Sequence, residues 1–266
     1  MAGLYSRDYS VLTKQEIAEK DRIDNESIVV ANRLTIRKNC FHKYPKAVRH
    51  NMSLFPNNYL DIMQLKEEEE LRHQCDGFEE LLNKRGITEL DIKRYIQDNG
   101  YYHIPASIFE GYSFGHHEAV LFKEFQLGAT YQADYLLAGK ASGGWQFIFV
   151  EFENPYGAVT LKDGNLGEVI RMGLNQIDDW KTYIEAHYAT IQEEFEKHTQ
   201  NMLPKEFLRY DATRMHFVVV AGRRNHYDNE ITRMHQRRIE RERNIRLMHY
   251  DNLLDSARRL IGAQTY

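Results

Sequence analysis

The sequence predicts an α/β fold in which a mixed β-sheet begins with an antiparallel meander and is flanked by helices. Continuous apolar runs at residues 145–152 and 215–222 are typical of central strands that are covered on both faces. Residues 119–128 and 129–139 alternate in part between apolar and polar side chains, and the turn-rich segment "GKASGGW" joins the second of them to the strand at 145. Helical stripes separate the later strands, which predicts a mixed sheet.

Composition sets the bounds for this fold. The 266 residues suffice for one large domain or a domain with an appendage, and 42% hydrophobic with 28% charged residues is typical of a soluble globular protein. The net charge of −4 means that affinity for nucleic acid requires a local basic patch. No apolar run approaches the roughly 20 residues of a membrane span, and the polar N-terminus has no signal-peptide core. We therefore expect a cytoplasmic protein without a membrane partner.

The N-terminal part is the least determined. The segment "ESIVVANRLTIRKN" fits either a strand pair or a helix, and prolines break the chain after it. Residues 59–85 carry an apolar stripe through charged residues, which predicts one helix. A boundary at Gly86 then separates a mainly helical N-terminal region, 1–86, from a second domain, 87–266.

Helices and strands alternate in the second domain. Thr88 and Asp91 have the spacing of a capping box, so a helix is expected from Thr88 to the stop at Gly100. After the three meander strands, we expect Asn165 to cap a helix, because Glu168 follows it by three residues. A strand at 215–222, a charged helix, a short strand at 245–250 and a last helix from about 251 complete the order.

Two acids, Glu151 and Glu153, end the apolar strand at 145–152, and they share one face because they are two residues apart. A two-residue turn at Ser142 and Gly143 would place Asp134 directly opposite Glu151, with their Cβ atoms roughly 4.5–5.5 Å apart. An odd loop length would turn Asp134 to the other face. The register of this hairpin therefore tests whether three carboxylates converge.

Converging carboxylates repel one another, and a divalent cation such as Mg²⁺ removes the conflict. Such a site activates water for attack on a phosphodiester. Gln176 and Trp180 lie four residues apart on the following helix, and Gln176 would lie beside the sheet to orient water or a phosphate oxygen. The alternatives are acids that only blunt a strand end and a glutamine on a helix surface.

These motifs resemble the PD-(D/E)XK nucleases and, more specifically, the Shedu anti-phage nuclease family. The resemblance runs from about residue 78 to the C-terminus, through "FEELLNKRGITELDIKRYIQDNG", "LGATYQADYLL", "FVEFENP", "GLNQIDDWKTYI", "FVVVAGRR" and "MHYDNLLDSARRL". It implies a restriction-endonuclease-like core, DNA cleavage in phage defence and a homo-oligomer. Carried over by position, Asp134 and Glu151 would hold Mg²⁺ or Mn²⁺, helped by a backbone carbonyl near Phe152.

Glu153 departs from the family pattern, because it stands where the motif usually has lysine. A glutamate cannot contribute the positive charge, although it could act as general base. Another lysine could fill the role, and the sequence offers Lys140, Lys162 or Lys181. The departure also leaves open a catalytically weak scaffold that binds nucleic acid. A glycosidase with paired carboxylates is a third and less favoured interpretation.

Basic residues for DNA contact concentrate between residues 223 and 246, interspersed with acids that could form internal ion pairs on a solvated helix. Arg223 and Arg224 are the best-placed pair, because they end a core strand. Lys162 and Arg171 lie close in sequence to the proposed site and are lesser candidates. No zinc-type His/Cys spacing, P-loop or nucleophile elbow is present, which disfavours those chemistries.

Overall fold

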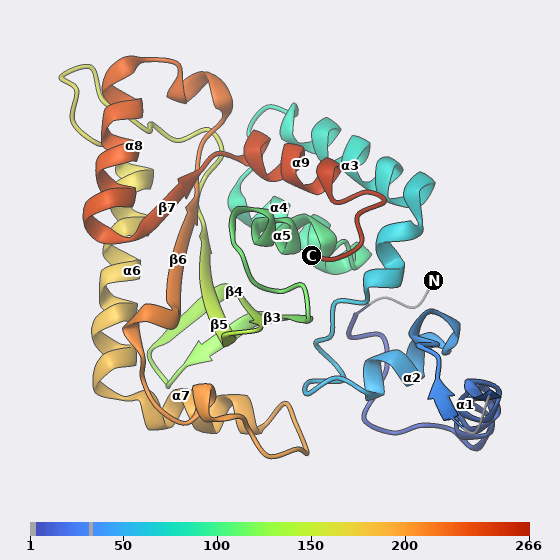
Figure 1. The fold of residues 1–266 in the computed structure, drawn as a ribbon. Helices are drawn as coiled ribbons and strands as arrows, with labels where there is room; N and C mark the ends of the chain where they lie inside the picture. Colours follow the sequence, from blue (N-terminus) through green and yellow to red (C-terminus); the bar gives the residue numbers. More distant parts are fainter. Residues whose placement is uncertain (1–3, 32–33) are drawn as a thin grey trace.

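A five-stranded sheet of order β3-β4-β5-β6-β7 organises the chain in the computed structural model, which describes residues 4–31 and 34–266 (Figure 1). Its first three strands are antiparallel, and β5, β6 and β7 are parallel. The predicted α/β layout with a leading meander is therefore confirmed. The strands are β3 (Glu118–Leu127), β4 (Tyr131–Ala141), β5 (Gly144–Phe152), β6 (Met215–Val220) and β7 (Ile245–Met248).

Helices cover both faces of this sheet (Figure 1). On one face lie α6 (Glu168–Ala186) and α8 (Glu230–Arg243), and α7 (Tyr188–Glu196) packs near β3. On the other lie α3 (Glu68–Leu82), α4 (Glu89–Asn99), α5 (His103–Ala106) and α9 (Tyr250–Arg259). None of the helices in the described ranges is long and apolar enough to cross a membrane.

The N-terminal segment contains α1 (Lys14–Glu26), α2 (Lys46–Asn51) and a two-stranded antiparallel sheet. That sheet consists of β1 (Ile28–Ala31) and β2 (Leu34–Arg37), so of the two alternatives for this stretch the strand pair is correct.

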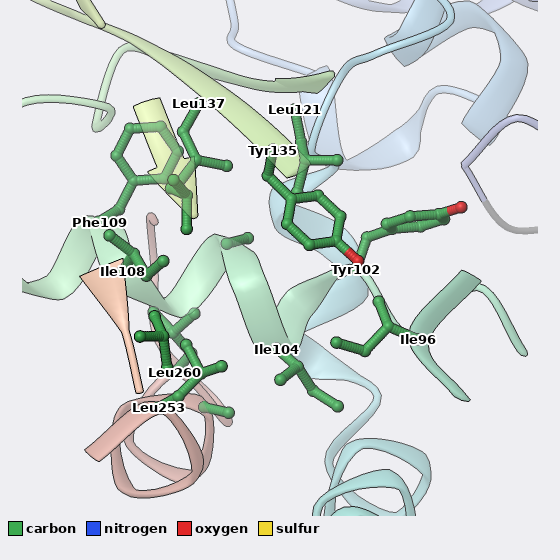
Figure 2. Close-up of a cluster of buried hydrophobic side chains, with 14 of the residues drawn as sticks. Ile96, Tyr102, Ile104, Ile108, Phe109, Leu121, Tyr135, Leu137, Leu253 and Leu260 are labelled. Atoms are coloured by element: carbon green, nitrogen blue, oxygen red, sulfur yellow. The ribbon is translucent and has the colours of Figure 1, made fainter. Parts of the chain in front are cut away.

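Alternation along β4 and β5 decides which side chains face which helices. Tyr135 and Leu137 enter the core beneath α5 and α9, shown in Figure 2, whereas Leu136 packs on the α6 side. Because side chains alternate along a strand, Asp134 lies on the same face as Leu136. Phe149 of β5 belongs to the α6 side by the same rule, and so do the acids that follow it.

The prediction of one helix over 59–85 was wrong. Tyr59 bridges to Val120 of β3, which draws the chain into an extended path. Asp61 then caps a short 3₁₀ helix, Ile62–Lys66, and Glu67 has non-helical φ/ψ of −83° and 59°. Only at Glu68 does α3 begin, since sheet pairing outweighs the helical stripe before it.

Two predicted helix starts had opposite outcomes. Thr88 caps α4 in a capping box with Asp91, as predicted, and Gly100 ends it in the left-handed conformation with φ 71°. Asn165 does not cap α6, so that prediction was wrong. Its carbonyl accepts from Leu161 and closes a loop, which delays the helix to Glu168.

The N-terminal region and the second domain share one hydrophobic core. Leu71 and Phe78 of α3 join the same buried cluster as Leu253 of α9. Arg258 of α9 adds ion pairs to two acids of α3. The boundary at Gly86 stays a prediction, and the packing shows that α3 lies firmly against the sheet domain.

Candidate active site

The β4-β5 hairpin has the register predicted for a turn at Ser142 and Gly143, with pairs from Tyr135/Val150 to Ala141/Gly144. Asp134 and Glu151 are the next positions in that register. There the ladder stops, and Asp134 Oδ2 accepts a hydrogen bond from the Phe152 N–H at 2.9 Å. Asp134 and Glu151 therefore lie beside each other at the carboxyl end of β5, as the hairpin arithmetic predicted.

On its other side, Asp134 borders an irregularity in β3. Glu124 has a left-handed φ of 50°, and it is left out of a ladder that pairs Lys123 with Tyr135 and Phe125 with Ala133. A non-glycine residue in this region is strained, and such strain gathers at functional sites. Asp134 thus lies at a break in both of its neighbouring ladders, where its carboxylate is free to make side-chain contacts.

Glu153 follows β5 and is buried between three elements. Its N–H donates to the Val220 carbonyl at 2.9 Å, and the Tyr250 hydroxyl donates to the Glu153 carbonyl at 2.8 Å. A Cβ on Gly173 of α6 would lie 3.2 Å from Glu153 Cγ, so the missing side chain allows α6 to approach. Only 5% of Glu153 is exposed, and 8% of Glu151.

A lysine that the sequence reasoning missed completes the cluster. Lys93 of α4 places its Nζ 2.8 Å from Asp134 Oδ1, with 22% of its side chain exposed. Glu89 lies one helical turn earlier and is close enough for its charge to raise the pKa of Glu151 and Glu153. The capping box predicted that both residues lie in the first turns of a helix, but nothing in the sequence predicted that this helix packs against the end of β4 and β5.

The lysines proposed from sequence lie elsewhere. Lys140 pairs with Trp145 near the opposite end of the hairpin, roughly 20 Å along β4 from Asp134. Lys181 donates to the Arg243 carbonyl at 2.6 Å and stands over the Phe217 ring. Lys162 is exposed on the loop between β5 and α6. The positive charge beside Asp134 comes from Lys93.

Burial and mutual repulsion shift the titration of this cluster. Burial, then the charges of Asp134 and Glu153, raise the pKa of Glu151 well above its ordinary range. Burial, then Glu89 and Asp134, raise the pKa of Glu153 to about 7. Burial also raises the pKa of Asp134 against the opposing effect of Lys93. Burial alone would lower the pKa of Lys93, but attraction to Asp134 outweighs it and the pKa is raised.

The carboxylate oxygens of Asp134 and Glu151 meet some of the requirements of a metal site. Glu151 Oε2 is buried and has no hydrogen-bond partner, which is costly unless a cation or proton occupies it. Each oxygen of Asp134 has one partner and keeps a further lone pair. Across residues 4–31 and 34–266, no group of three or more His, Cys, Asp or Glu side chains is arranged to hold a metal ion. The residues therefore fit an ion held by two carboxylates that keeps several waters, as Mg²⁺ commonly does.

Without added metal, we expect the free energy of unfolding to fall as pH rises from about 5 to 8. Glu151 and Glu153 have folded pKa values above the ordinary value, so the folded state holds protons that the unfolded chain has released. Their contribution is fully present below the unfolded pKa and is lost as pH rises through the folded values. In EDTA, the melting temperature of wild type should fall about 5 °C further over this range than that of Glu151→Gln. Equal pH dependence of the two proteins would contradict this electrostatic assignment.

Gln176 lies one turn after Gly173 on α6 and is half-buried. Residues three apart on a helix are neighbours, so Gln176 lies next to the position that Glu153 contacts. Trp180 is fully buried and packs in the core on this side. The role predicted for Gln176 stays a prediction.

Arg223 is engaged within the chain. Its Nε and Nη2 bind Asp251, with Nη2 to Oδ1 at 2.8 Å, and its Nη1 donates to the Leu82 carbonyl and the Tyr156 hydroxyl. Nη2 also donates to Asn83 Oδ1 at 3.2 Å. These contacts hold the C-terminal end of α3, where a cation is favourable.

The other basic candidates are exposed but differ in position. Arg224 directly follows Arg223 and pairs with Asp255 at 2.5 Å, with 57% of its side chain exposed. Arg171 is exposed on the first turns of α6, and Lys162 lies on the loop before it. The cluster at the end of β5 therefore unites Asp134, Glu151, Glu153 and Lys93. The basic residues predicted from the sequence, which are Arg223, Arg224, Lys162 and Arg171, do not contact it directly.

Comparison with known families matches residues 88–254 to the family described as Shedu protein SduA, C-terminal. The matched part contains α4 with Lys93, the β4-β5 hairpin with the carboxylates, and α6 with Gln176. A comparison with curated proteins found no match. The match covers more than half of the chain, and the chain therefore belongs to the Shedu family of anti-phage defence proteins.

Proposed function

We propose that this protein is a metal-dependent nuclease of the PD-(D/E)XK type that cleaves DNA in defence against phage. The observation that carries the proposal is the meeting of Asp134 and Glu151 with the Lys93 ammonium at one edge of the sheet. Two carboxylates can hold a divalent cation and an ammonium can stabilise charge on a phosphate, and both suit phosphodiester hydrolysis. We further propose that the chain works as a cytoplasmic homo-oligomer, with residues 1–86 serving assembly or regulation.

Asp134 and Glu151, with the backbone carbonyl near Phe152, would hold Mg²⁺ or Mn²⁺. When bound, such an ion lowers the pKa of a coordinated water and neutralises negative charge on the phosphate. The unpartnered Glu151 Oε2 supports this role, because an inward-facing carboxylate oxygen without a donor is stabilised by a cation.

The remaining side chains act on the water and the phosphate. Glu153 serves as the general base, since a pKa of about 7 lets it accept the proton of the attacking water at neutral pH. Lys93 contributes the positive charge that the usual motif lysine would give, and stabilises negative charge on the phosphate oxygens. Gln176, next to Glu153, orients the water or a phosphate oxygen.

A catalytically weak scaffold that binds nucleic acid is the second candidate. Lys93 already neutralises Asp134 at 2.8 Å, and the part of the chain that the structure describes has no larger ligand group for a metal. On this interpretation the acid cluster is closed by an internal ion pair, and the protein binds DNA without cutting it.

Cleavage of supercoiled plasmid and linear DNA distinguishes the two candidates. We expect Mg²⁺ or Mn²⁺ to support cleavage, EDTA to abolish it, and excess Mg²⁺ added after EDTA to restore it. The products are read on agarose gels over a time course, with EDTA-treated protein without added metal as the control. Binding of DNA with no cleavage of any substrate in either metal would reject the nuclease and leave the scaffold.

A further inference from the structure

A cavity of about 290 Å³ opens two strands away from the acid cluster, at the carboxyl ends of β6 and β7. Arg224, which begins a short 3₁₀ helix after β6, lines it together with Arg233 and Arg237 of α8. His249 and Asn252, at the start of α9, line it from the other side. Ligands of open α/β sheets bind outside the carboxyl ends of the strands, which is where this cavity lies.

The ion pairs of Arg224 and Arg237 are with acids at the surface. Arg224 pairs with Asp255 at 2.5 Å, and Arg237 with Glu230 at 2.8 Å. Exposed pairs of this kind contribute about 0–1 kcal/mol, so a stronger anion displaces them at little cost. A guanidinium has five N–H donors, and each of these two uses one of them in its ion pair.

The third arginine, Arg233, is held by a backbone hydrogen bond and has only a long ion pair. Arg233 Nε donates to the Tyr227 carbonyl at 3.0 Å, which orients the guanidinium, while its pairing with Asp228 is long at 3.6 Å. Asp228 is the one acid among the described residues that line the cavity. Each of the three guanidinium groups has one carboxylate partner, and of these partners only Asp228 lines the cavity, so several N–H donors remain for a ligand.

The N-terminus of α9 adds positive electrostatic potential to the cavity. His249 is the N-cap of α9 and Asn252 lies in its first turn, so the positive end of the helix dipole lies at the cavity wall. Arginine forks match phosphate oxygens in bidentate geometry. The lining therefore selects a phosphate group as its ligand.

The ends of β5, β6 and β7 form one continuous edge between the two sites. Gly222 donates to the Asn154 carbonyl, and Tyr250 donates to the Gly222 carbonyl. Two strand spacings separate β5 from β7, about 10 Å. Because successive phosphates are at least one 3.4 Å rise apart, a nucleic-acid strand covers that distance in at most about three nucleotide steps. A nucleic-acid strand whose scissile phosphate lies at the acid cluster reaches the cavity with a neighbouring backbone phosphate.

We propose that this arginine cavity binds a backbone phosphate of the DNA a few nucleotides from the cleaved bond. The inference rests on the proposed nuclease function for the identity of the ligand. It assigns Arg233 and Arg237, together with Arg224, to holding the strand in register.

The salt dependence of DNA binding tests the cavity. Affinity for a labelled duplex is measured by fluorescence anisotropy in EDTA at several salt concentrations, for wild type, Arg233→Gln, Arg237→Gln and the double variant. Because the cavity would hold one phosphate, we expect the double substitution to lower the magnitude of the slope of log affinity against log salt by about 0.9, and each single substitution to lower it by part of that amount. Arg238→Gln is the matched control, since Arg238 lies on the same exposed helix in an ion pair with Glu242 at 3.0 Å and does not line the cavity. Its slope should equal that of wild type.

Equal slopes for Arg237→Gln and Arg238→Gln would overturn the proposal, and so would a wild type that binds no DNA. Inorganic phosphate and adenosine monophosphate are tested for thermal stabilisation of wild type and Arg237→Gln. Stabilisation of wild type alone, with unchanged DNA slopes, would show a small-anion site and reject the backbone contact. DNA binding is measured in EDTA, where no cleavage is expected, so this test does not depend on nuclease activity. If the slopes are as expected but the protein cuts no DNA in Mg²⁺ or Mn²⁺, only the proposed nuclease function is contradicted.

Discussion

Asp134→Asn and Glu151→Gln are each expected to lower the rate of metal-dependent DNA cleavage at least about 10³-fold. Either substitution removes one of two carboxylates available to the ion, and loss of the several kcal/mol of charge stabilisation from a bound ion corresponds to about tenfold per 1.36 kcal/mol. Both side chains are largely buried, so the amide that replaces either carboxylate stays at the same place in the cluster.

The measurement is the initial rate of plasmid cleavage in Mg²⁺, together with the melting temperature of each variant. Glu206→Gln is the matched control, because Glu206 lies against Gly144 at the turn end of the hairpin. Its rate should equal that of wild type. Glu151→Gln should melt no lower than wild type in EDTA, since it removes a buried and unpaired acid. Cleavage that persists in both site variants would disprove the assignment of the metal ligands.

Lys93→Gln is expected to lower the cleavage rate by about 10²- to 10³-fold, the effect of removing one preorganised charge donor. Glu153 occupies the usual motif position and cannot give this charge, while Lys93 Nζ lies within hydrogen-bond distance of Asp134. Lys93→Arg keeps the charge with a different shape, so it should retain more activity than Lys93→Gln.

Lys140→Gln is the control for this series, because Lys140 lies on β4 but far from Asp134. Rates are determined with saturating DNA and compared with thermal stability. A purely structural lysine would give the opposite pattern: Lys93→Gln would melt at a lower temperature but, once folded, would cut DNA at the wild-type rate.

The hairpin shows what local sequence determines. Turn residues at Ser142 and Gly143 define the register of two long strands, and the register brings Asp134 to Glu151 although 17 residues separate them. The order of helices and strands along the second domain also follows from local patterns, since apolar runs and helical stripes alternate. These features depend on neighbouring residues, and so they were predictable.

Lys93 and Glu89 depend on how α4 docks against the sheet edge, which no local pattern encodes. Their spacing of four residues is equally typical of a solvated helix face. The predictions of a cap at Asn165 and of one helix over 59–85 were wrong for a related reason. At Asn165 a loop hydrogen bond replaced the helical hydrogen bonds that the pattern favoured, and at Tyr59 pairing with β3 did so.

The bridge from Arg223 to the end of α3 has a consequence for control of the protein. The carboxylates belong to the hairpin, whereas Lys93 belongs to the helix that follows Leu82 and Asn83, the residues that Arg223 holds. The cluster is thus a two-part assembly, and a shift of α3 and α4 by about 1 Å would withdraw the lysine while leaving the acids in place. A ligand or second subunit that favours one arrangement of these helices would switch the acid cluster on or off without touching it.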